Sequence, residues 1–368
     1  MSSDLSDLWN WFADTQCRTY SPLYERICHA VAGSEHVLDL VRGAPPEAHL
    51  PNVLLASVHY LLLSGLEHPL ADVYAGTSDR DPGPLFVDVC VTRSREIAGL
   101  LTTRRTNTNE AGRSALLGPA LTEVAALIGE PLGLVDVGCS AGLNLLCDRY
   151  LLDYGPFGTT GPADAPVRLE CQVTGGGPPI ADRLPPIGVR LGLDLDPVDL
   201  EDDDAVRWQL ALVWPDTGRL ERTRACLDLA RGADLRIVRG DAVDALPGVL
   251  AAVPPGCLPV VLTTWVLAYL SPDRRDEFVG VLRDASARRP VAWISGEAEG
   301  VVDLMGDIQV PRDDTGIDAS VLGLVVFDGG RHDARVLGTG HPHGRSLEWR
   351  AGERGPSGGD DRRPEHPE

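Results

Sequence analysis

The stretch that decides the fold is Leu134-Val135-Asp136-Val137-Gly138-Cys139-Ser140-Ala141-Gly142-Leu143-Asn144. An apolar run ends at an acidic residue, a loop of small side chains follows, and a helical pattern begins near Leu143. This order predicts a buried β-strand, a tight turn and the start of a helix. Since a loop with little side-chain volume lets a nucleotide-like ligand approach the backbone, we expect a cofactor loop here.

The loop has the spacing Asp-x-Gly-x-Ser-x-Gly and resembles the cofactor loop of class I S-adenosylmethionine-dependent methyltransferases. The resemblance implies that S-adenosyl-L-methionine is held by the loop residues Asp136, Gly138, Ser140, Gly142 and Asn144. The dinucleotide fingerprint Gly-x-Gly-x-x-Gly fits less well, because Leu143 stands where its third glycine belongs. An NAD(P)-dependent oxidoreductase is therefore the weaker alternative.

Composition limits the class of protein. The length of 368 residues favours two units, or one domain with a large appendage. The 33 basic residues are all arginine, and a chain without lysine has neither a Schiff-base lysine nor a Walker A loop. A net charge of −21 disfavours nucleic acid, whose phosphates are bound through clustered positive charge. We therefore expect a small-molecule substrate and no nucleic-acid partner.

The sequence also predicts where the protein works. No window approaches the about 20 apolar residues that span a bilayer, and residues 1–7 lack the positive region of a signal peptide. The eight cysteines are scattered without a Cys-x-x-Cys pair, which is typical of small buried thiols in a reducing compartment. We expect a cytoplasmic protein with no membrane partner.

The apolar pattern divides the chain into three parts. Residues 1–128 show helical spacing and are predicted to form a helical cap domain. Residues 129–350 alternate strands with helices, which predicts an α/β Rossmann-like domain with a doubly wound, mostly parallel sheet. Residues 351–368 are rich in Gly, Pro and charge, and are expected to be a disordered tail.

Within the α/β part, we expect strands at 133–137, 187–195, 235–238, 259–265 and 290–295. Helices are predicted between them at 143–152, 197–213, 220–231, 243–253 and 272–287. A hairpin around Asp328-Gly329-Gly330 is expected to close the sheet, as in the class I methyltransferase fold. The Gly- and Pro-rich segment 153–186 is predicted to be a β insertion that either shapes a substrate pocket or is decoration.

Three residues that follow later strands are candidates for cofactor contacts. Asp194 is expected to accept the ribose hydroxyls, while Asp196 suits a helix cap before Pro197. Asp241 resembles the acid that accepts the adenine amino group, with a helix cap as the alternative. Trp265 is expected either to touch the cofactor or to belong to the core.

Several polar residues are candidates for substrate contacts or proton transfer. Tyr269, after the fourth strand, is a candidate proton acceptor. Asn109, Glu110 and Arg113 lie just before a helix, and either cap it or contact the substrate. His59, within an apolar helical segment, is a further candidate for the substrate.

The segment His341-Pro342-His343-Gly344 has two histidines that are close enough in sequence to bind one metal ion. No third ligand has suitable spacing, so we expect no metal. A structural or substrate role is favoured instead, with His343 as a candidate catalytic residue.

A series of motifs extends over nearly the whole chain. It comprises Thr-Asn-Glu-x-x-Arg (108–113), the loop (136–144), Gly-x-Asp-Leu-x-Pro-Val-Asp (192–199), Trp-Pro-Asp (214–216) and His-Pro-His-Gly…Leu-Glu-Trp (341–349). The series resembles an uncharacterised bacterial family, domain of unknown function two-three-three-two. Members often carry Gln where Asn107 stands. The resemblance implies a shared fold and supplies no reaction.

These features predict an S-adenosylmethionine-dependent methyltransferase that acts on an oxygen or nitrogen of a small molecule. The sulfonium methyl group is already activated, so catalysis requires in-line positioning and removal of a proton from the acceptor. The alternative is a non-catalytic regulatory or scaffold module that binds an S-adenosyl ligand. No Asn/Asp-Pro-Pro-Tyr-type acceptor motif follows the fourth strand. The sequence leaves the acceptor, the base and the oligomeric state open.

Overall fold

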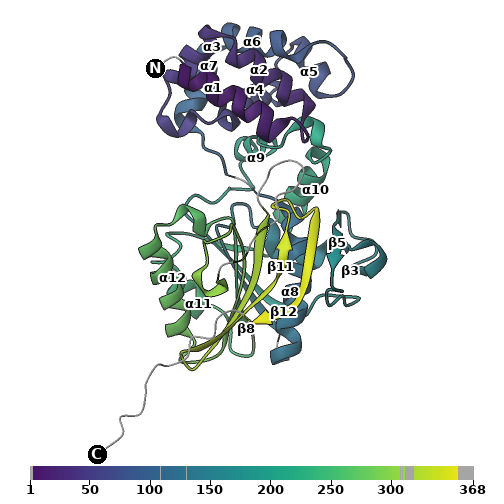
Figure 1. Cartoon of the computed structure of the whole chain (residues 1–368), viewed down its shortest axis with the longest axis vertical. Coiled ribbons are helices and arrows are strands. Elements are labelled where there is room, and N and C mark those ends of the chain that lie inside the picture. Colours follow the sequence, from purple (N-terminus) through teal and green to yellow (C-terminus); the bar gives the residue numbers. More distant parts are fainter. Residues whose placement is uncertain are drawn as a thin grey trace, which may run out of the picture. The chain divides into compact units, whose positions relative to one another are not determined.

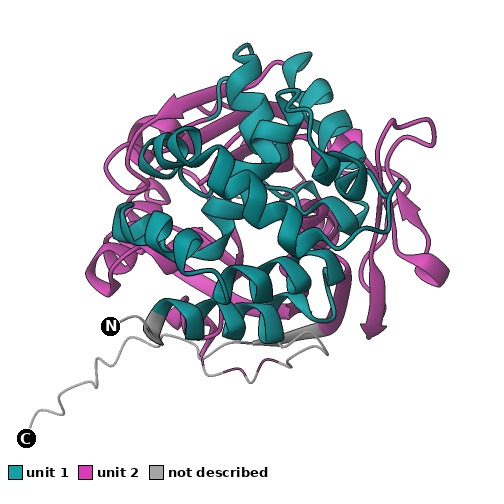
Figure 2. Ribbon diagram, turned by 90° about the horizontal axis from the view of Figure 1, so that it is seen from above, with its two compact units in different colours: residues 1–111, 198–233, 312–317 teal, residues 112–197, 234–311, 318–368 magenta. Residues whose placement is uncertain are grey.

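The computed structural model describes residues 3–107, 109–129, 131–306, 308, 310 and 319–354. These residues form two compact units, which are coloured separately in Figure 2. The helical unit contains the described parts of 1–111 and 198–233, and the sheet unit contains those of 112–197, 234–311 and 318–368. Neither unit is continuous in sequence, because the chain leaves the sheet unit after Pro197 and returns to it at Asp234.

The helical unit begins with seven α-helices and one π-helical turn: α1 (Ser3–Phe12), η1 (Ala13–Cys17), α2 (Pro22–Ala32), α3 (Glu35–Arg42), α4 (Pro51–Leu63), α5 (Pro69–Tyr74), α6 (Pro82–Thr92) and α7 (Ser94–Thr103). Proline opens α2, α4, α5 and α6, where its missing N–H group costs no helical hydrogen bond. The segment 198–233 adds α9 (Asp203–Ala211) and α10 (Leu220–Arg231).

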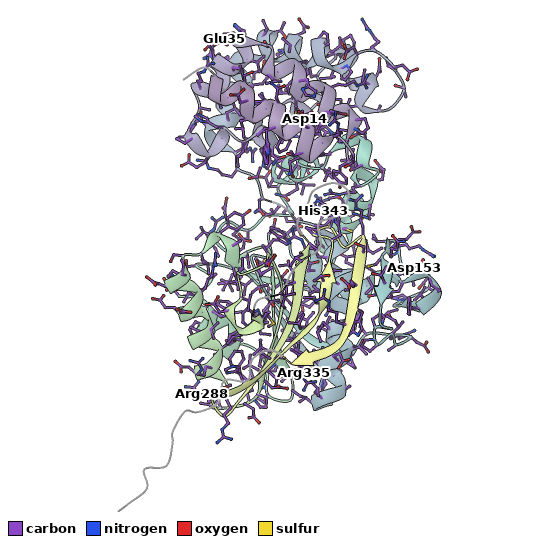
Figure 3. All side chains as sticks on the ribbon, in the orientation of Figure 1. Asp14, Glu35, Asp153, Arg288, Arg335 and His343 are labelled. Atoms are coloured by element: carbon purple, nitrogen blue, oxygen red, sulfur yellow. The ribbon has the colours of Figure 1, made fainter. Side chains whose placement is uncertain are left out.

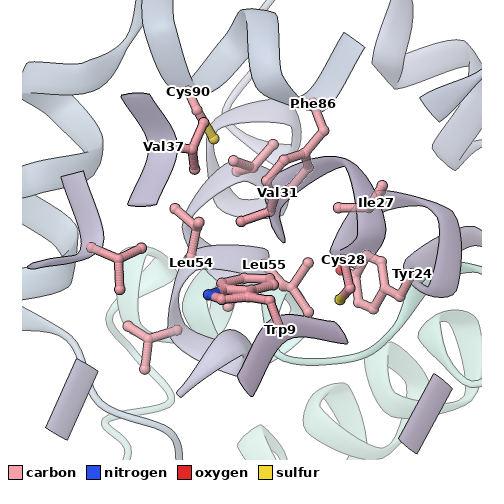
Figure 4. Close-up of a cluster of buried hydrophobic side chains, with 14 of the residues drawn as sticks. Trp9, Tyr24, Ile27, Cys28, Val31, Val37, Leu54, Leu55, Phe86 and Cys90 are labelled. Carbon is pink, nitrogen blue, oxygen red and sulfur yellow. The ribbon is translucent and has the colours of Figure 1, made fainter. Parts of the chain in front are cut away.

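A single apolar core holds the helical unit together. Figure 4 shows part of it, in which Trp9, Tyr24 and Phe86 are fully buried side chains from three different helices. Trp208 and Ala211 of α9 belong to the same core, although they lie more than a hundred residues further along the chain. Their burial explains why residues 198–233 pack with the N-terminal helices.

The sheet unit is built on a nine-stranded sheet with the order β5-β12-β11-β10-β9-β8-β1-β6-β7. Its parallel part consists of β1 (Leu132–Val137), β6 (Ile187–Asp194), β7 (Arg236–Arg239), β8 (Leu258–Thr264) and β9 (Val291–Glu297). These strands lie where the sequence predicts them, within a few residues at each end. The structure therefore confirms the α/β class and a large, mostly parallel sheet.

Helices cover the sheet on both faces. Figure 1 shows α11 (Leu246–Ala251) and α12 (Pro272–Ala285) along one face and α8 (Ser114–Ile128) on the other. Val135 and Val137 share a core with residues of α11 and α12. Because side chains alternate along a strand, Asp136 between them points away from that core.

The chain after β1 departs from the prediction. Residues Leu143–Arg149 form a 3₁₀ segment, η4, instead of the expected α-helix over 143–152. Leu146 has non-helical backbone angles, φ −104° and ψ 18°, and the Tyr150 hydroxyl donates to the Leu143 carbonyl at 2.9 Å. Strand β2 (Leu151–Asp153) then begins inside the predicted helix. Its pairing with β3 (Thr159–Thr160) and β4 (Arg168–Glu170) explains why the helix stops early.

The segment 153–186 contributes short strands, of which β5 (Gln172–Gly175) joins the edge of the large sheet beside β12 (Ser346–Arg354). The expected hairpin is present as β10 (Ser320–Asp328) and β11 (Arg331–Gly340). Its turn residues Gly329 and Gly330 have φ of 56° and 78°, the positive values that a type I′ turn requires.

Two expected boundaries lie elsewhere in the structure. The strand β12 extends to Arg354, and Glu353 and Arg354 pair with Val336 and Arg335 of β11, so residues 351–354 belong to the sheet and not to a tail. Residues 355–368 lie outside the described part. The helix α8, expected in the helical cap, belongs to the sheet unit, because the Tyr154 hydroxyl donates to the Ala115 carbonyl at 2.9 Å. No helix in the described ranges is long and apolar enough to cross a membrane.

Candidate functional site

The strand order places a topological switch point between β1 and β8. From β1 the chain continues to β6 and β7 on one side, and later to β8 and β9 on the other. The five strands are parallel, so their carboxyl ends lie at one edge of the sheet. In open α/β sheets ligands bind outside these ends at the switch point. The loop 138–142 and the residues after Thr264 thus frame the candidate site.

The glycines of the loop are required by their surroundings. Gly138 has φ of 74°, and a Cβ atom there would lie 2.6 Å from Cγ2 of Val266. Gly142 also has φ of 74°, and a Cβ atom there would lie 3.2 Å from Leu235. Both positions combine a left-handed backbone with a close neighbour, and glycine meets both demands.

Backbone strain marks both sides of the switch point. Within the described part of the chain, Ser140 and Trp265 are the two residues other than glycine with positive φ, 52° and 58°. Ser140 lies in the loop after β1, and Trp265 directly follows β8. The Trp265 indole donates to Oγ of Ser320 at 2.6 Å, which holds the ring against β10. Strained residues cluster at functional sites, and here they flank the expected ligand position.

Asp194 links the end of β6 to the loop. Its Oδ2 atom accepts from the amide of Ser140 at 2.8 Å, and its Oδ1 atom accepts from the amide of Asp196 at 2.8 Å. Each carboxylate oxygen has a second lone pair, so Asp194 can accept further hydrogen bonds from a ligand. The exposed Asp196 pairs with Arg239 at 2.6 Å.

The amides of the loop are already used within the protein. Gly138 and Cys139 donate to the Leu193 carbonyl at 2.7 and 3.4 Å, Ser140 donates to Asp194, and Gly142 donates to the Cys139 carbonyl at 2.7 Å. The loop therefore offers no nest of free amides over these positions. It presents small side chains, and the Ser140 hydroxyl is buried without a hydrogen-bond partner among the described residues.

Asp136, the acid of the motif, lies beneath the loop and is 1% exposed. Burial raises the pKa of its carboxyl group to about 7, with a contribution from the negative charge of Asp194, while the positive charge of Arg113 acts in the opposite direction. The Oδ2 atom of Asp136 has no hydrogen-bond partner in the described ranges. Asp136 therefore supports the loop from below and does not face solvent.

Glu297, at the end of β9, is a buried acid that no motif of the sequence indicates. Its Oε1 atom accepts from the amides of Val266 and Leu267 at 3.1 and 3.2 Å. Burial raises the pKa of Glu297 to about 7, opposed by these two amides and by Arg113. The strand expected from the sequence ends at Ser295, two residues before the end of β9. A predicted strand that was two residues longer would have included Glu297 at the edge of the site.

Arg113 connects several parts of the sheet edge. Its Nη1 atom donates to the carbonyl of Thr264 at 2.9 Å, and its Nε atom donates to the carbonyl of Pro342 at 3.0 Å. Together with Glu297, Arg113 fixes the backbone on both sides of Trp265. The sequence predicts that Arg113 either caps a helix or contacts the substrate. The structure adds a third role, in which Arg113 fixes the backbone around the site.

The histidine motif is a compact turn next to Arg113. Nδ1 of His341 accepts from the amide of His343 at 2.9 Å, and Nε2 of His341 lies 2.8 Å from Arg345. A Cβ atom at Gly344 would lie 1.8 Å from the Gly112 carbonyl oxygen, so the turn packs directly on the chain before α8. Figure 3 labels His343 in the sheet unit.

Three other candidates of the sheet unit have defined partners or positions. Oδ1 of Asp241 accepts from the amide of Val243 at 2.8 Å, and the carboxylate also pairs with Arg274. These contacts, the Val243 amide first, lower the pKa of Asp241. They form a turn before α11, whose N-cap position is Ala245, so Asp241 does not cap that helix. Asn144 is buried and accepts from the Ser114 hydroxyl at 3.1 Å. Tyr269 is 86% exposed.

The remaining candidates belong to the helical unit. His59 is buried in its core, with Nδ1 3.1 Å from the Ala211 carbonyl, and burial lowers the pKa of its ring to about 4. Glu110 is buried between Arg219 and Arg222, at 2.9 and 3.0 Å. Asn109 precedes it, and Thr108 of the same motif lies outside the described residues. His59 and Glu110 therefore stabilise the helical unit itself.

One group of potential metal ligands occurs in the described ranges. Oxygen or nitrogen atoms of Asp14, Glu25 and His29 lie within 4.8 Å of one another in the helical unit, where Figure 3 labels Asp14. His29 pairs with Asp14 at 3.5 Å, and Glu25 pairs with Arg18 at 3.6 Å. Asp14 and His29 thus contact each other, and Glu25 pairs with an arginine outside the group.

One protein-family model, described as an uncharacterized protein conserved in bacteria (DUF2332), matches residues 6–349. The chain belongs to this family. The match confirms the resemblance seen in the sequence motifs and covers both units, so the helical unit is as much a part of the family's chain as the sheet unit. No curated protein matches this DUF2332 chain.

Proposed function

We propose that this DUF2332 protein binds S-adenosyl-L-methionine at the switch point between β1 and β8, and transfers its methyl group to an oxygen or nitrogen of a small molecule. The observation that supports the proposal most directly is that the backbone amides of the loop donate hydrogen bonds within the protein. A pyrophosphate needs free backbone amides and a helix N-terminus. Here four loop amides bond within the protein, and a 3₁₀ segment follows. These features disfavour NAD(P) and suit a cofactor without phosphates.

The residues of the site fit such a ligand. Gly138 and Gly142 leave room beside the backbone, and the buried Ser140 hydroxyl supplies a hydrogen-bonding group without a partner among the described residues. Asp194 is fixed in place by two amides and retains lone pairs for the ribose hydroxyls. Asp241 stands at the end of the neighbouring strand β7, where it would accept the adenine amino group beside Arg274.

The protein's own residues would position the acceptor and remove its proton. S-adenosyl-L-methionine supplies an activated methyl group when it is bound, so precise positioning is the main demand on the protein. Arg113 and Glu297 hold the backbone around Trp265, which gives the site a rigid wall. Tyr269 and His343 are the proposed proton acceptors, and the substrate contacts proposed from the sequence include Arg113.

Calorimetric titration with S-adenosylmethionine, S-adenosylhomocysteine and NAD tests the proposal. We expect both S-adenosyl ligands to bind and NAD not to bind. Asp194→Ala is expected to weaken binding about 10- to 100-fold, as for a lost hydrogen bond to a charged group. Asp196→Ala, two residues away, exposed and paired with Arg239, is the matched control. Asp194→Asn tests the charge while it keeps an acceptor for the loop amide.

Two outcomes would change the conclusion. Binding of NAD without binding of either S-adenosyl ligand would overturn the proposal. The 86% exposure of Tyr269 favours one second candidate, a non-catalytic module that binds the same ligand. Tight S-adenosyl binding without methyl transfer to a broad panel of alcohols, phenols and amines would establish that alternative.

A further inference from the structure

A cavity lies at the amino-terminal edge of the sheet unit, opposite the switch point. It has a volume of about 720 Å³ and is bounded by α11, α12 and the first residues of β8 and β9. Pockets for small molecules have volumes of about 300–1,000 Å³. The switch point is formed by the carboxyl ends of the same strands, so this cavity is a different site.

The walls of the cavity are mainly apolar. Leu250 and Ala251 of α11 contribute one side, and Val281 and Ala285 of α12 contribute another. Prolines 247, 255, 259 and 290 stiffen the rim, because their rings fix the backbone. A ligand with an apolar chain would remove this surface from water, which contributes about 25 cal/mol for each Å².

The charged groups of the lining favour an anion. They are Arg288, Arg289 and Asp284, so the lining is net positive in a chain with a net charge of −21. Arg289 donates only to backbone carbonyls, among them those of Val253 and Pro254 at 2.8 and 2.9 Å. Its positive charge therefore meets no carboxylate within the described part of the chain.

Arg288 is the second cation of the cavity, and Figure 3 labels it. Its side chain is exposed, and no hydrogen bond or ion pair joins it to a residue that the structure describes. An exposed guanidinium group beside an apolar cavity can pair with a carboxylate in a bidentate manner.

We propose that this cavity binds an aliphatic carboxylate of medium chain length. Its carboxylate would pair with the Arg288 guanidinium group, with the positive charge of Arg289 nearby, and its chain would lie between Leu250 of α11 and Ala285 of α12. The proposal does not depend on the function proposed for the switch point.

Cys257 provides a native reporter for this site. It lines the cavity and is half-buried, whereas the other seven cysteines are buried. Iodoacetamide should therefore alkylate Cys257 first, and an occupied cavity should slow that reaction. The rate at the Cys257 peptide can be followed by mass spectrometry on the full-length protein.

The experiment measures protection of Cys257 by decanoate and by 1-decanol, which has the same chain without a charge. We expect decanoate to protect at lower concentration than 1-decanol. Arg288→Gln should raise the decanoate concentration that gives half-protection about two- to fivefold, because it removes an exposed ion pair. The 1-decanol concentration that gives half-protection should stay unchanged. Arg283→Gln, five residues earlier in α12 and lining another cavity, is the matched control.

A cavity-filling variant tests the apolar part of the proposal. Ala251 is an exposed wall residue, so Ala251→Phe should fill the space without disturbing the core and should abolish protection by both compounds. Circular dichroism of each variant checks that the fold is retained. Equal protection by decanoate and 1-decanol, or no protection by decanoate below its micelle concentration, would overturn the proposal.

Discussion

At the scale of single residues, Asp136 shows how burial changes the behaviour of a motif residue. Its folded pKa of about 7 lies above the ordinary value of 3.8. Between these values the folded state holds a proton that the unfolded state releases. The contribution of Asp136 to the free energy of unfolding should therefore be greatest below pH 4. This contribution should be lost as the pH rises toward 7.

We predict that Asp136→Asn removes this pH dependence. The free energy of unfolding is measured with urea between pH 5 and pH 8. In the native protein, Asp136 should make it fall with rising pH by up to about 1.4 kcal/mol per pH unit. This contribution to the slope should be absent in the variant. The exposed Asp196→Asn is the control. An unchanged slope in Asp136→Asn would show that Asp136 ionises freely in the folded protein.

The sequence found some residues of the candidate site and missed others for a physical reason. Gly138, Ser140 and Gly142 can be recognised in the sequence, because a tight loop permits few residue types. Glu297 carries no such signal, since its importance comes from burial next to the chain after β8. Glu110 is expected either at the start of a helix or near the substrate, and the structure buries it between two arginines of a distant segment.

At the scale of elements, the segment that carries α9 and α10 is attached to the N-terminal helices by two motifs. The ring of Trp214 lies 5.2 Å from that of Tyr24, and Asp216 accepts from the Ser21 hydroxyl at 2.5 Å and from the Leu23 amide at 3.0 Å. Glu110 adds its pairs with α10. Periodicity predicted both helices, but the cap expected at Asp196 is wrong, because α9 begins at Asp203 and is capped by Asp202. Periodicity also does not say which core an apolar face joins.

We predict that Glu110→Gln loosens α10 from the helical unit. The variant leaves Arg219 and Arg222, whose side chains are 12% and 26% exposed, without the carboxylate between them. Since both arginines keep some contact with water, we expect a loss of about 1.5–3 kcal/mol of stability, as for hydrogen bonds to a charged group. Hydrogen exchange should show faster exchange of amides in α10 and a lower melting temperature. Glu67→Gln, at an exposed glutamate, is the control. Unchanged protection of α10 would mean that Trp214 and Asp216 hold the segment without Glu110.

At the scale of the whole molecule, the interleaved order of the units distinguishes this chain from a cap domain followed by a Rossmann-like domain. The crossover from β6 to β7 passes through the helical unit, so each unit depends on two separate stretches of sequence. A chain cut at the expected boundary after residue 128 would lose α8 from the sheet unit. It would also leave α9 without its core.

The last prediction concerns a chain that begins at Gly112. It keeps residues 198–233 but removes the helices that cover them, so Trp208 and Trp214 would be exposed to water, and we expect it to aggregate. The same chain with 198–233 replaced by a short Gly-Ser linker should be monomeric in size-exclusion chromatography, because it loses the uncovered apolar surface. If the first truncated chain were monomeric and the second aggregated, residues 198–233 would belong energetically to the sheet unit.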